Sequence, residues 1–277
     1  MLEVEEFFDL VFFRPLAFLF VKLVYPTSIT PNQISFVAVG FGVMSGVAFG
    51  FAMYEALITA AMLLVIYNVL DCSDGQLARL KKTGTITGRI VDGLSDWVVA
   101  SAVYLGLGFG YGNSAENPLL AWLFVVLAGA TNAVHSIMLD FYRNRFLDNI
   151  LNRAGTLGDS LQEFENAYRE LGKSPGKYFD KFILWIYLKY SSLQIRFSSE
   201  TNTRFDTDDY YLKNRRILHL WTYIGPTTEW TFLIICSLLN RIDIFLFGLI
   251  VVGNLYAALL YFFQTRINRT LKPATTV

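Results

Sequence analysis

The sequence predicts an all-α integral membrane protein with six transmembrane helices. An N-terminal amphipathic surface helix and a helical or irregular cytoplasmic insert between spans four and five complete the predicted fold. Three observations lead to it. Hydrophobic residues make up 54% of the chain, with a mean hydropathy of +0.42. The apolar residues form blocks near the length of about 20 residues that crosses a bilayer. The basic residues gather on one side of these blocks.

Six apolar segments are long enough to span a membrane, and backbone groups in lipid must be satisfied within such segments, which favours helices. They cover approximately residues 34–53, 56–70 with an extension to about 80, 90–110, 118–141, 218–239 and 243–264.

Residues 3–24 are not predicted to be a seventh span. Acidic residues open this segment, and Arg14, Pro15 and Lys22 interrupt its apolar run. We expect an amphipathic helix lying at the membrane surface, with a short buried helix packed on the bundle as the alternative.

The distribution of basic residues predicts the orientation. Of the 23 Lys and Arg residues, the connections near 51–56, 111–117 and 240–243 contain one, Arg241. Loops rich in Lys and Arg mark the cytoplasmic face. Both termini, the turn near 79–89 and the long segment 148–217 are therefore expected in the cytoplasm, in a cell inner membrane or an endomembrane.

The chain divides into four predicted parts. Residues 1–32 hold the interfacial helix, and residues 33–147 hold spans one to four. Residues 148–217 form the cytoplasmic insert, in which 161–171 and 178–190 read as helical. Residues 218–277 hold spans five and six with a short basic tail.

The segment 71–96, DCSDGQLARLKKTGTITGRIVDGLSD, places four aspartates at the end of span two and the start of span three. Asp71 and Asp74 are spaced i and i+3, and Asp92 and Asp96 are spaced i and i+4, so each pair shares a helix face. A helical hairpin brings the two pairs together just inside the membrane boundary. Carboxylates there are costly and face a cavity or a partner, and converging carboxylates are suited to Mg²⁺ or Mn²⁺.

Other residues of the segment suit a nucleotide. Gly75, Ala78 and Gly88 are small enough for a ligand to lie close to the backbone, and Arg79 can pair with a phosphate. Carboxylates for metal, a guanidinium for phosphate and a smooth floor for a base together indicate transfer of a phosphate-linked group from a nucleotide.

The motif D71-x2-D74-G75-x2-A78-R79-x8-G88-x3-D92-x3-D96 resembles the signature of the CDP-alcohol phosphotransferase (phosphatidyltransferase) family, with every motif position filled. The resemblance extends over most of residues 1–145, including the N-terminal surface helix and TPNQIS at 30–35, which opens the first span. Residues after about 147 match nothing as specific.

The resemblance implies a reaction in which a CDP-linked alcohol gives its substituted phosphoryl group to a hydroxyl acceptor and CMP leaves. It implies that two metal ions, Mg²⁺ or Mn²⁺, are held by Asp71, Asp74, Asp92 and Asp96. Asp96 would also act as the general base. The CDP part would be surrounded by Asp74, Gly75, Ala78, Arg79 and Gly88.

The substrates remain open at this point. The E-Y-H-T-G stretch of eukaryotic members that use soluble CDP-alcohols is absent, which favours CDP-diacylglycerol as donor in phospholipid biosynthesis. Arg143, Arg145 and Arg215 are candidate contacts for an anionic acceptor such as an inositol phosphate or glycerol phosphate. The alternative within the family is transfer from a soluble CDP-alcohol to a lipid hydroxyl such as diacylglycerol or ceramide.

A function of another class is an ion-coupled membrane transporter, which predicts charges near the bilayer midplane and repeated halves. The expected partners are the two substrates and membrane lipids, with a homodimer as an option. The balance of 23 basic and 23 acidic residues gives no reason to expect nucleic acid.

Three smaller features have structural interpretations. Gly42, Gly46 and Gly50 indicate close helix packing in the first span. The glycine-rich segment 106–112 is expected to be a flexible span end. His135 lies inside the fourth span, where a hydrogen-bonded core histidine is favoured over a catalytic one.

Overall fold

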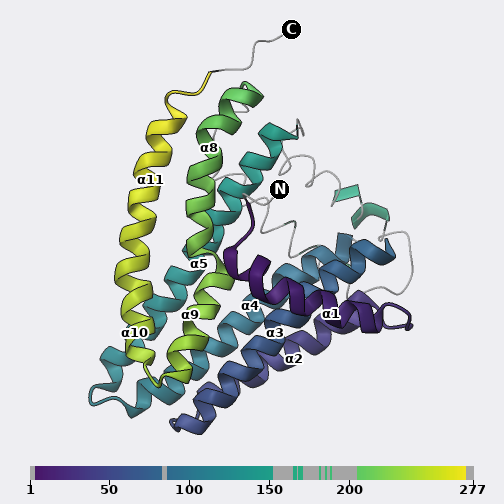
Figure 1. Ribbon diagram of the computed structural model, residues 1–277. Coiled ribbons are helices and arrows are strands. Elements are labelled where there is room, and N and C mark those ends of the chain that lie inside the picture. Colours follow the sequence, from purple (N-terminus) through teal and green to yellow (C-terminus); the bar gives the residue numbers. More distant parts are fainter. Residues whose placement is uncertain are drawn as a thin grey trace.

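The computed structural model describes residues 4–82, 86–151 and 205–272, with isolated positions between 165 and 188; side chains are not described in 86–93. Every regular element in this part of the chain is helical (Figure 1). The helices predicted at 161–171 and 178–190 lie largely outside the described residues.

The N-terminal segment forms a short π-helix, η2 (Asp9–Phe13), that continues into α1 (Arg14–Val24). Phe13, Ala17 and Val21 recur at helical spacing and are buried, and α1 packs along α3. The opposite face exposes apolar side chains, including Phe18 and Leu23. A helix that is apolar on its outer face suits a membrane interface, and that location stays a prediction.

The next helices are α2 (Pro31–Phe49), α3 (Tyr54–Lys81) and α4 (Ile86–Leu107), which continues into the π-helix η3 (Gly108–Gly112). Thr30 begins α2 with a capping box, because its hydroxyl accepts from the Gln33 N–H while the Gln33 side chain accepts from the Thr30 N–H. The helix α2 packs against both α3 and α4.

The glycines of α2 create its close contact with α4. A Cβ atom at Gly42 would lie 2.5 Å from Val99 Cγ2, and one at Gly46 would lie 2.5 Å from the Ala102 carbonyl carbon. Both distances are shorter than van der Waals contact allows, so the backbones approach where only glycine fits. The prediction of close packing at Gly42 and Gly46 is confirmed.

The prediction of a flexible end at residues 106–112 is wrong. This segment is helical, and Gly108, Gly110 and Gly112 are buried. Side chains at Gly108 and Gly110 would collide with Trp122 and with the Phe49 carbonyl. The glycines therefore serve packing against neighbouring helices, which a sequence pattern does not distinguish from a loose end.

The second half of the chain begins with the long helix α5 (Pro118–Ile150). It is followed by α8 (Thr207–Trp221), the 3₁₀ turn η4 (Thr222–Ile224), α9 (Pro226–Leu238), α10 (Ile242–Phe247), the π-helix η5 (Gly248–Gly253) and α11 (Asn254–Asn268). The segment predicted as one span, 218–239, is thus divided. Gly225 is extended, and Pro226 lacks the N–H that a continuous helix requires.

Within the described residues, four helical segments are long and apolar enough to cross a membrane. They are Pro31–Phe49, Tyr54–Lys81, Pro118–Ile150 and Ile242–Asn268. The corresponding four predicted spans are confirmed as helices of suitable length and composition.

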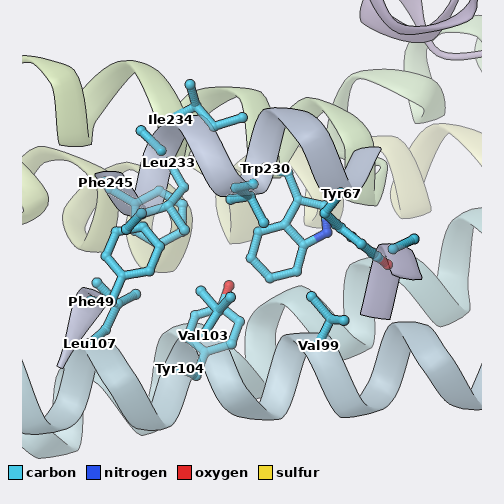
Figure 2. Packing of buried hydrophobic residues seen from close by; sticks show 14 of the residues in the cluster. Phe49, Tyr67, Val99, Val103, Tyr104, Leu107, Trp230, Leu233, Ile234 and Phe245 are labelled. Atoms are coloured by element: carbon cyan, nitrogen blue, oxygen red, sulfur yellow. The ribbon is translucent and has the colours of Figure 1, made fainter. Parts of the chain in front are cut away.

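Two buried clusters hold these helices together. The first, shown in Figure 2, joins α2, α3 and α4 to α9 and α10 through side chains such as Phe49, Tyr67, Trp230 and Phe245. The second joins α5, α8 and α11, which run side by side in Figure 1. The helix α9 therefore packs directly on the helices that carry the aspartate motif.

Candidate active site at the ends of α3 and α4

One face of α3 carries the first half of the motif. With 3.6 residues per turn, Tyr67, Asp71, Asp74 and Ala78 fall within about 60° of one another around the helix axis. Asp74 and Tyr67 are buried, and Asp71 is half-buried. Asp71 and Asp74 therefore share one face of α3 with the buried Tyr67.

Asp74 is anchored to α2. The Ser35 hydroxyl donates a hydrogen bond to Asp74 Oδ2 and also contacts the Pro31 carbonyl. Ser35 is held there because α2 begins at the Thr30 cap, one turn earlier. A serine on the first helix thus orients a carboxylate of the second.

Asp96 faces α3 from the neighbouring helix. Its Oδ1 accepts a hydrogen bond from the Tyr67 hydroxyl, with 2.6 Å between the oxygens. This contact joins α4 to the face of α3 that holds Asp71 and Asp74. Asp96 therefore lies against the helix that carries Asp71 and Asp74, and the meeting of all four carboxylates stays a prediction.

The rest of the motif is described less fully. Positions 88 and 92 are helical within α4, as predicted, but the side chain of Asp92 lies outside the described residues. Among described side chains, no three acidic, histidine or cysteine groups are close enough to hold a metal ion. The donor set fits Mg²⁺ or Mn²⁺ chemically, because aspartate oxygens are the hard ligands these ions prefer. The two-metal site stays a prediction.

Two residues predicted to contact CDP lie together. The Arg79 guanidinium bends back over Gly75, so that a Cβ atom at Gly75 would lie 3.5 Å from Arg79 Nη1. Arg79 is exposed, and Ala78 beside it is half-buried. A half-exposed glycine next to a guanidinium can receive a phosphate group.

The N-terminal segment ties the motif helix to α9, which the sequence did not reveal. The Glu6 carboxylate accepts hydrogen bonds from the Thr228 N–H at 2.8 Å and the Thr228 hydroxyl at 2.9 Å, and so caps the start of α9. Nearby, Asp9 Oδ1 lies 3.6 Å from the sulfur of Cys72, between two motif aspartates. The buried Glu6 and the half-buried Asp9 therefore connect the N-terminal segment to α9 and to α3.

Burial dominates the electrostatics of this acidic pair. It raises the pKa of Glu6 to about 7, against the lowering effect of the Thr228 hydrogen bonds and the Arg143 charge. Burial also raises the pKa of Asp9, where Arg14 acts in the opposite direction. Glu6 and Asp9 lie one helical turn apart in the sequence. This spacing indicated the solvated polar face of a surface helix and did not reveal the contact with α9.

The residues predicted to contact the acceptor lie on α5 and α8. Arg143 Nε donates to the Val4 carbonyl at 3.1 Å, and Arg143 also pairs with Asp140 at 3.7 Å. The Arg145 guanidinium lies 5.8 Å from the Phe205 ring centroid, and that of Arg215 lies 5.6 Å from the Tyr211 ring. Because α5 and α8 pack together, the three arginines occupy neighbouring helices, and their acceptor role stays a prediction.

His135 is a hydrogen-bonded core residue, as favoured from the sequence. It is fully buried, and its Nδ1 lies 2.6 Å from Glu229 Oε1, while Asn132 donates to Glu229 Oε2 at 2.5 Å. This buried group connects α5 to α9. Cys72 and Cys236 are free cysteines.

Comparisons with known proteins agree with the position of the motif. Residues 28–157 match the family model described as CDP-alcohol phosphatidyltransferase. Over 122 residues the chain is 31% identical to a phosphatidylinositol phosphate synthase of Corynebacterium glutamicum. That alignment covers 43% of this chain and 53% of the relative, so the chain spans about half the length of the curated protein it matches.

Proposed function

We propose that the chain is a membrane phosphotransferase of phospholipid synthesis, because residues 28–157 match the family model described as CDP-alcohol phosphatidyltransferase. It moves a substituted phosphoryl group from a CDP-linked alcohol to a hydroxyl acceptor and releases CMP. The observation that carries this proposal is the hydrogen bond from Tyr67 to Asp96. It brings the last motif carboxylate against the helix face that holds the first two.

In the proposed reaction, the acceptor oxygen attacks the phosphorus that carries the alcohol group. A bond forms between that oxygen and the phosphorus, and the bond from the phosphorus to the bridging oxygen of the diphosphate breaks. CMP leaves with the electron pair of that bond. Asp96 takes the proton of the acceptor hydroxyl, a role that typically contributes about 10²–10⁴-fold to the rate.

The other motif residues hold the donor. Arg79 pairs with a phosphate of CDP, and the small residues Gly75, Ala78 and Gly88 let the nucleotide lie close to the helices. Asp71, Asp74, Asp92 and Asp96 would hold two Mg²⁺ or Mn²⁺ ions. When bound, such ions supply positive charge to the diphosphate and to both the attacking and the leaving oxygen.

We propose CDP-diacylglycerol as the donor and a phosphorylated polyol, such as an inositol phosphate or glycerol phosphate, as the acceptor. Two things support this choice. The matched relative is a phosphatidylinositol phosphate synthase, and Arg143, Arg145 and Arg215 provide cationic groups on neighbouring helices. Guanidinium groups suit phosphate monoesters because they form paired hydrogen bonds.

We also propose six spans, with both termini and the active site on the cytoplasmic side. In addition to the four long apolar helices, α4 and the segment from the end of α8 through α9 would cross the membrane. The support is the position of the basic residues, because the connections at the opposite ends hold Arg241 alone of the 23 Lys and Arg residues.

The test is CMP release by the purified full chain in detergent or lipid vesicles. CDP-diacylglycerol is offered with a panel of acceptors, and soluble CDP-alcohols are offered with diacylglycerol or ceramide. We expect release with CDP-diacylglycerol and a phosphorylated polyol, loss of release with EDTA, and recovery with Mg²⁺ or Mn²⁺. Release without any divalent cation would contradict the metal site, and absence of release from every CDP donor would contradict the transferase function.

A further inference from the structure

Tyr67 lies outside the aspartate motif, yet it contacts the residue proposed as the base. It precedes Asp71 by one helical turn and lies on the same face of α3. Its side chain is 3% exposed and belongs to the buried cluster that includes Trp230 and Val99 (Figure 2). The ring is therefore held in place by packing against side chains of α4 and α9.

The hydroxyl of the buried Tyr67 side chain makes a polar contact. It donates to Asp96 Oδ1 at 2.6 Å, a length typical of a hydrogen bond to an ionised carboxylate. A buried hydroxyl requires a partner, and a carboxylate held by a fixed donor cannot rotate freely about its Cβ–Cγ bond. The rigid ring thus fixes the orientation of an otherwise exposed carboxylate.

We infer that Tyr67 is a positioning residue for the transfer reaction, which holds the carboxylate of Asp96 in the orientation that accepts the acceptor's proton. The inference rests on the proposed transferase function. Tyr67 itself touches neither substrate. It acts through Asp96, so its removal should slow turnover and leave donor binding unchanged.

The chain offers a matched control on the adjacent helix. Tyr104 of α4 is also a buried tyrosine, and its ring packs 6.0 Å from that of Trp230. Within the described residues, its hydroxyl has no hydrogen-bond partner. Removing the hydroxyl from Tyr104 therefore changes the same buried cluster without touching the motif.

The experiment compares Tyr67→Phe and Tyr104→Phe in full-length protein, by steady-state CMP release and by thermal unfolding in detergent. We expect Tyr67→Phe to lower kcat by about 10- to 100-fold, because small misplacements of reacting groups have effects of this size, with KM for the CDP donor within about twofold. Tyr104→Phe should keep wild-type kcat. An unchanged kcat in Tyr67→Phe, or a Tyr67→Phe protein that fails to fold while Tyr104→Phe folds, would overturn the inference.

A double-mutant cycle adds an independent readout. Asp96→Glu keeps a carboxylate but moves it away from the Tyr67 hydroxyl, so Tyr67→Phe should lower the residual kcat of this variant by less than about twofold. An additive loss would show that Tyr67 does not act through Asp96. If the wild-type protein releases CMP and either the single variants or the cycle give the contrary result, only the positioning role is overturned. If the wild-type protein releases no CMP, the transferase function is overturned as well.

Discussion

Ser35 on α2 donates a hydrogen bond to Asp74 on α3, a residue 39 positions later in the chain. This contact links the start of the first long helix to a proposed metal ligand. The donor set of a metal site depends on such partners, because they hold the ligating carboxylates in place. Ser35 is thus expected to affect metal binding without touching the ion.

Ser35→Ala is expected to raise the Mn²⁺ concentration for half-maximal CMP release by about 10-fold, the lower end of typical effects for residues that orient metal ligands. The measurement is a Mn²⁺ titration of activity. Ser45→Ala is the matched control, since Ser45 is buried on the same helix but donates to the Ala60 carbonyl. If Ser35→Ala and the wild type show equal Mn²⁺ dependence, Ser35 does not support metal binding.

The buried carboxylate of Glu6 is expected to make the free energy of unfolding depend on pH. Its pKa rises from 4.5 to about 7 on folding because of burial, with Asp9 acting in the same direction and Arg143 and Thr228 against it. The folded state therefore holds the proton more tightly than the unfolded state. Its contribution to stability is fully present below about pH 4.5 and is lost as the pH rises to about 7, with an upper limit of about 3 kcal/mol.

The variant Glu6→Gln should flatten this dependence when thermal unfolding is followed from pH 5 to pH 8. Some slope should remain, because the pKa of Asp9 is also raised. Glu116→Gln, at an exposed position, should keep the wild-type slope. If Glu6→Gln and wild type lose stability in parallel, the carboxylate at the start of α9 does not titrate in this range.

Arg143→Ala is expected to raise KM for a phosphorylated acceptor by about 10-fold, the effect of one charge-assisted hydrogen bond, with KM for the CDP donor nearly unchanged. Because Arg143 also donates to the Val4 carbonyl, Arg143→Gln serves as a second variant that retains a donor but lacks the charge. The same rise in both variants assigns the effect to the charge. An unchanged KM for the acceptor would show that Arg143 does not contribute to acceptor binding.

The sequence predicted those parts of the fold that depend on local patterns. Apolar blocks located α2, α3, α5 and the final helical segment, because membrane helices satisfy their own backbone groups and require long apolar runs. The spacing of the aspartates placed each pair on one helix face. The break at Gly225 and Pro226 was missed, although both residues are visible, because the apolar run continues through them.

The partners of the motif residues were not predictable in the same way. Ser35, Tyr67 and Glu6 make contacts with residues 39, 29 and 222 positions away, which depend on how the helices pack. The acids of the N-terminal segment indicated a polar surface, whereas the structure buries Glu6 against the start of α9. A composition pattern shows that a helix is amphipathic but does not show which neighbour covers it.

The assignment of Asp96 as the base is tested most directly by CMP release from Asp96→Asn. Asn keeps an oxygen that can accept from Tyr67 but cannot take a proton at neutral pH. We predict a folded protein that binds the CDP donor and releases no CMP, while Asp243→Asn, at an exposed carboxylate paired with Arg241, retains wild-type release. Turnover by Asp96→Asn at the wild-type rate would contradict the proposed site.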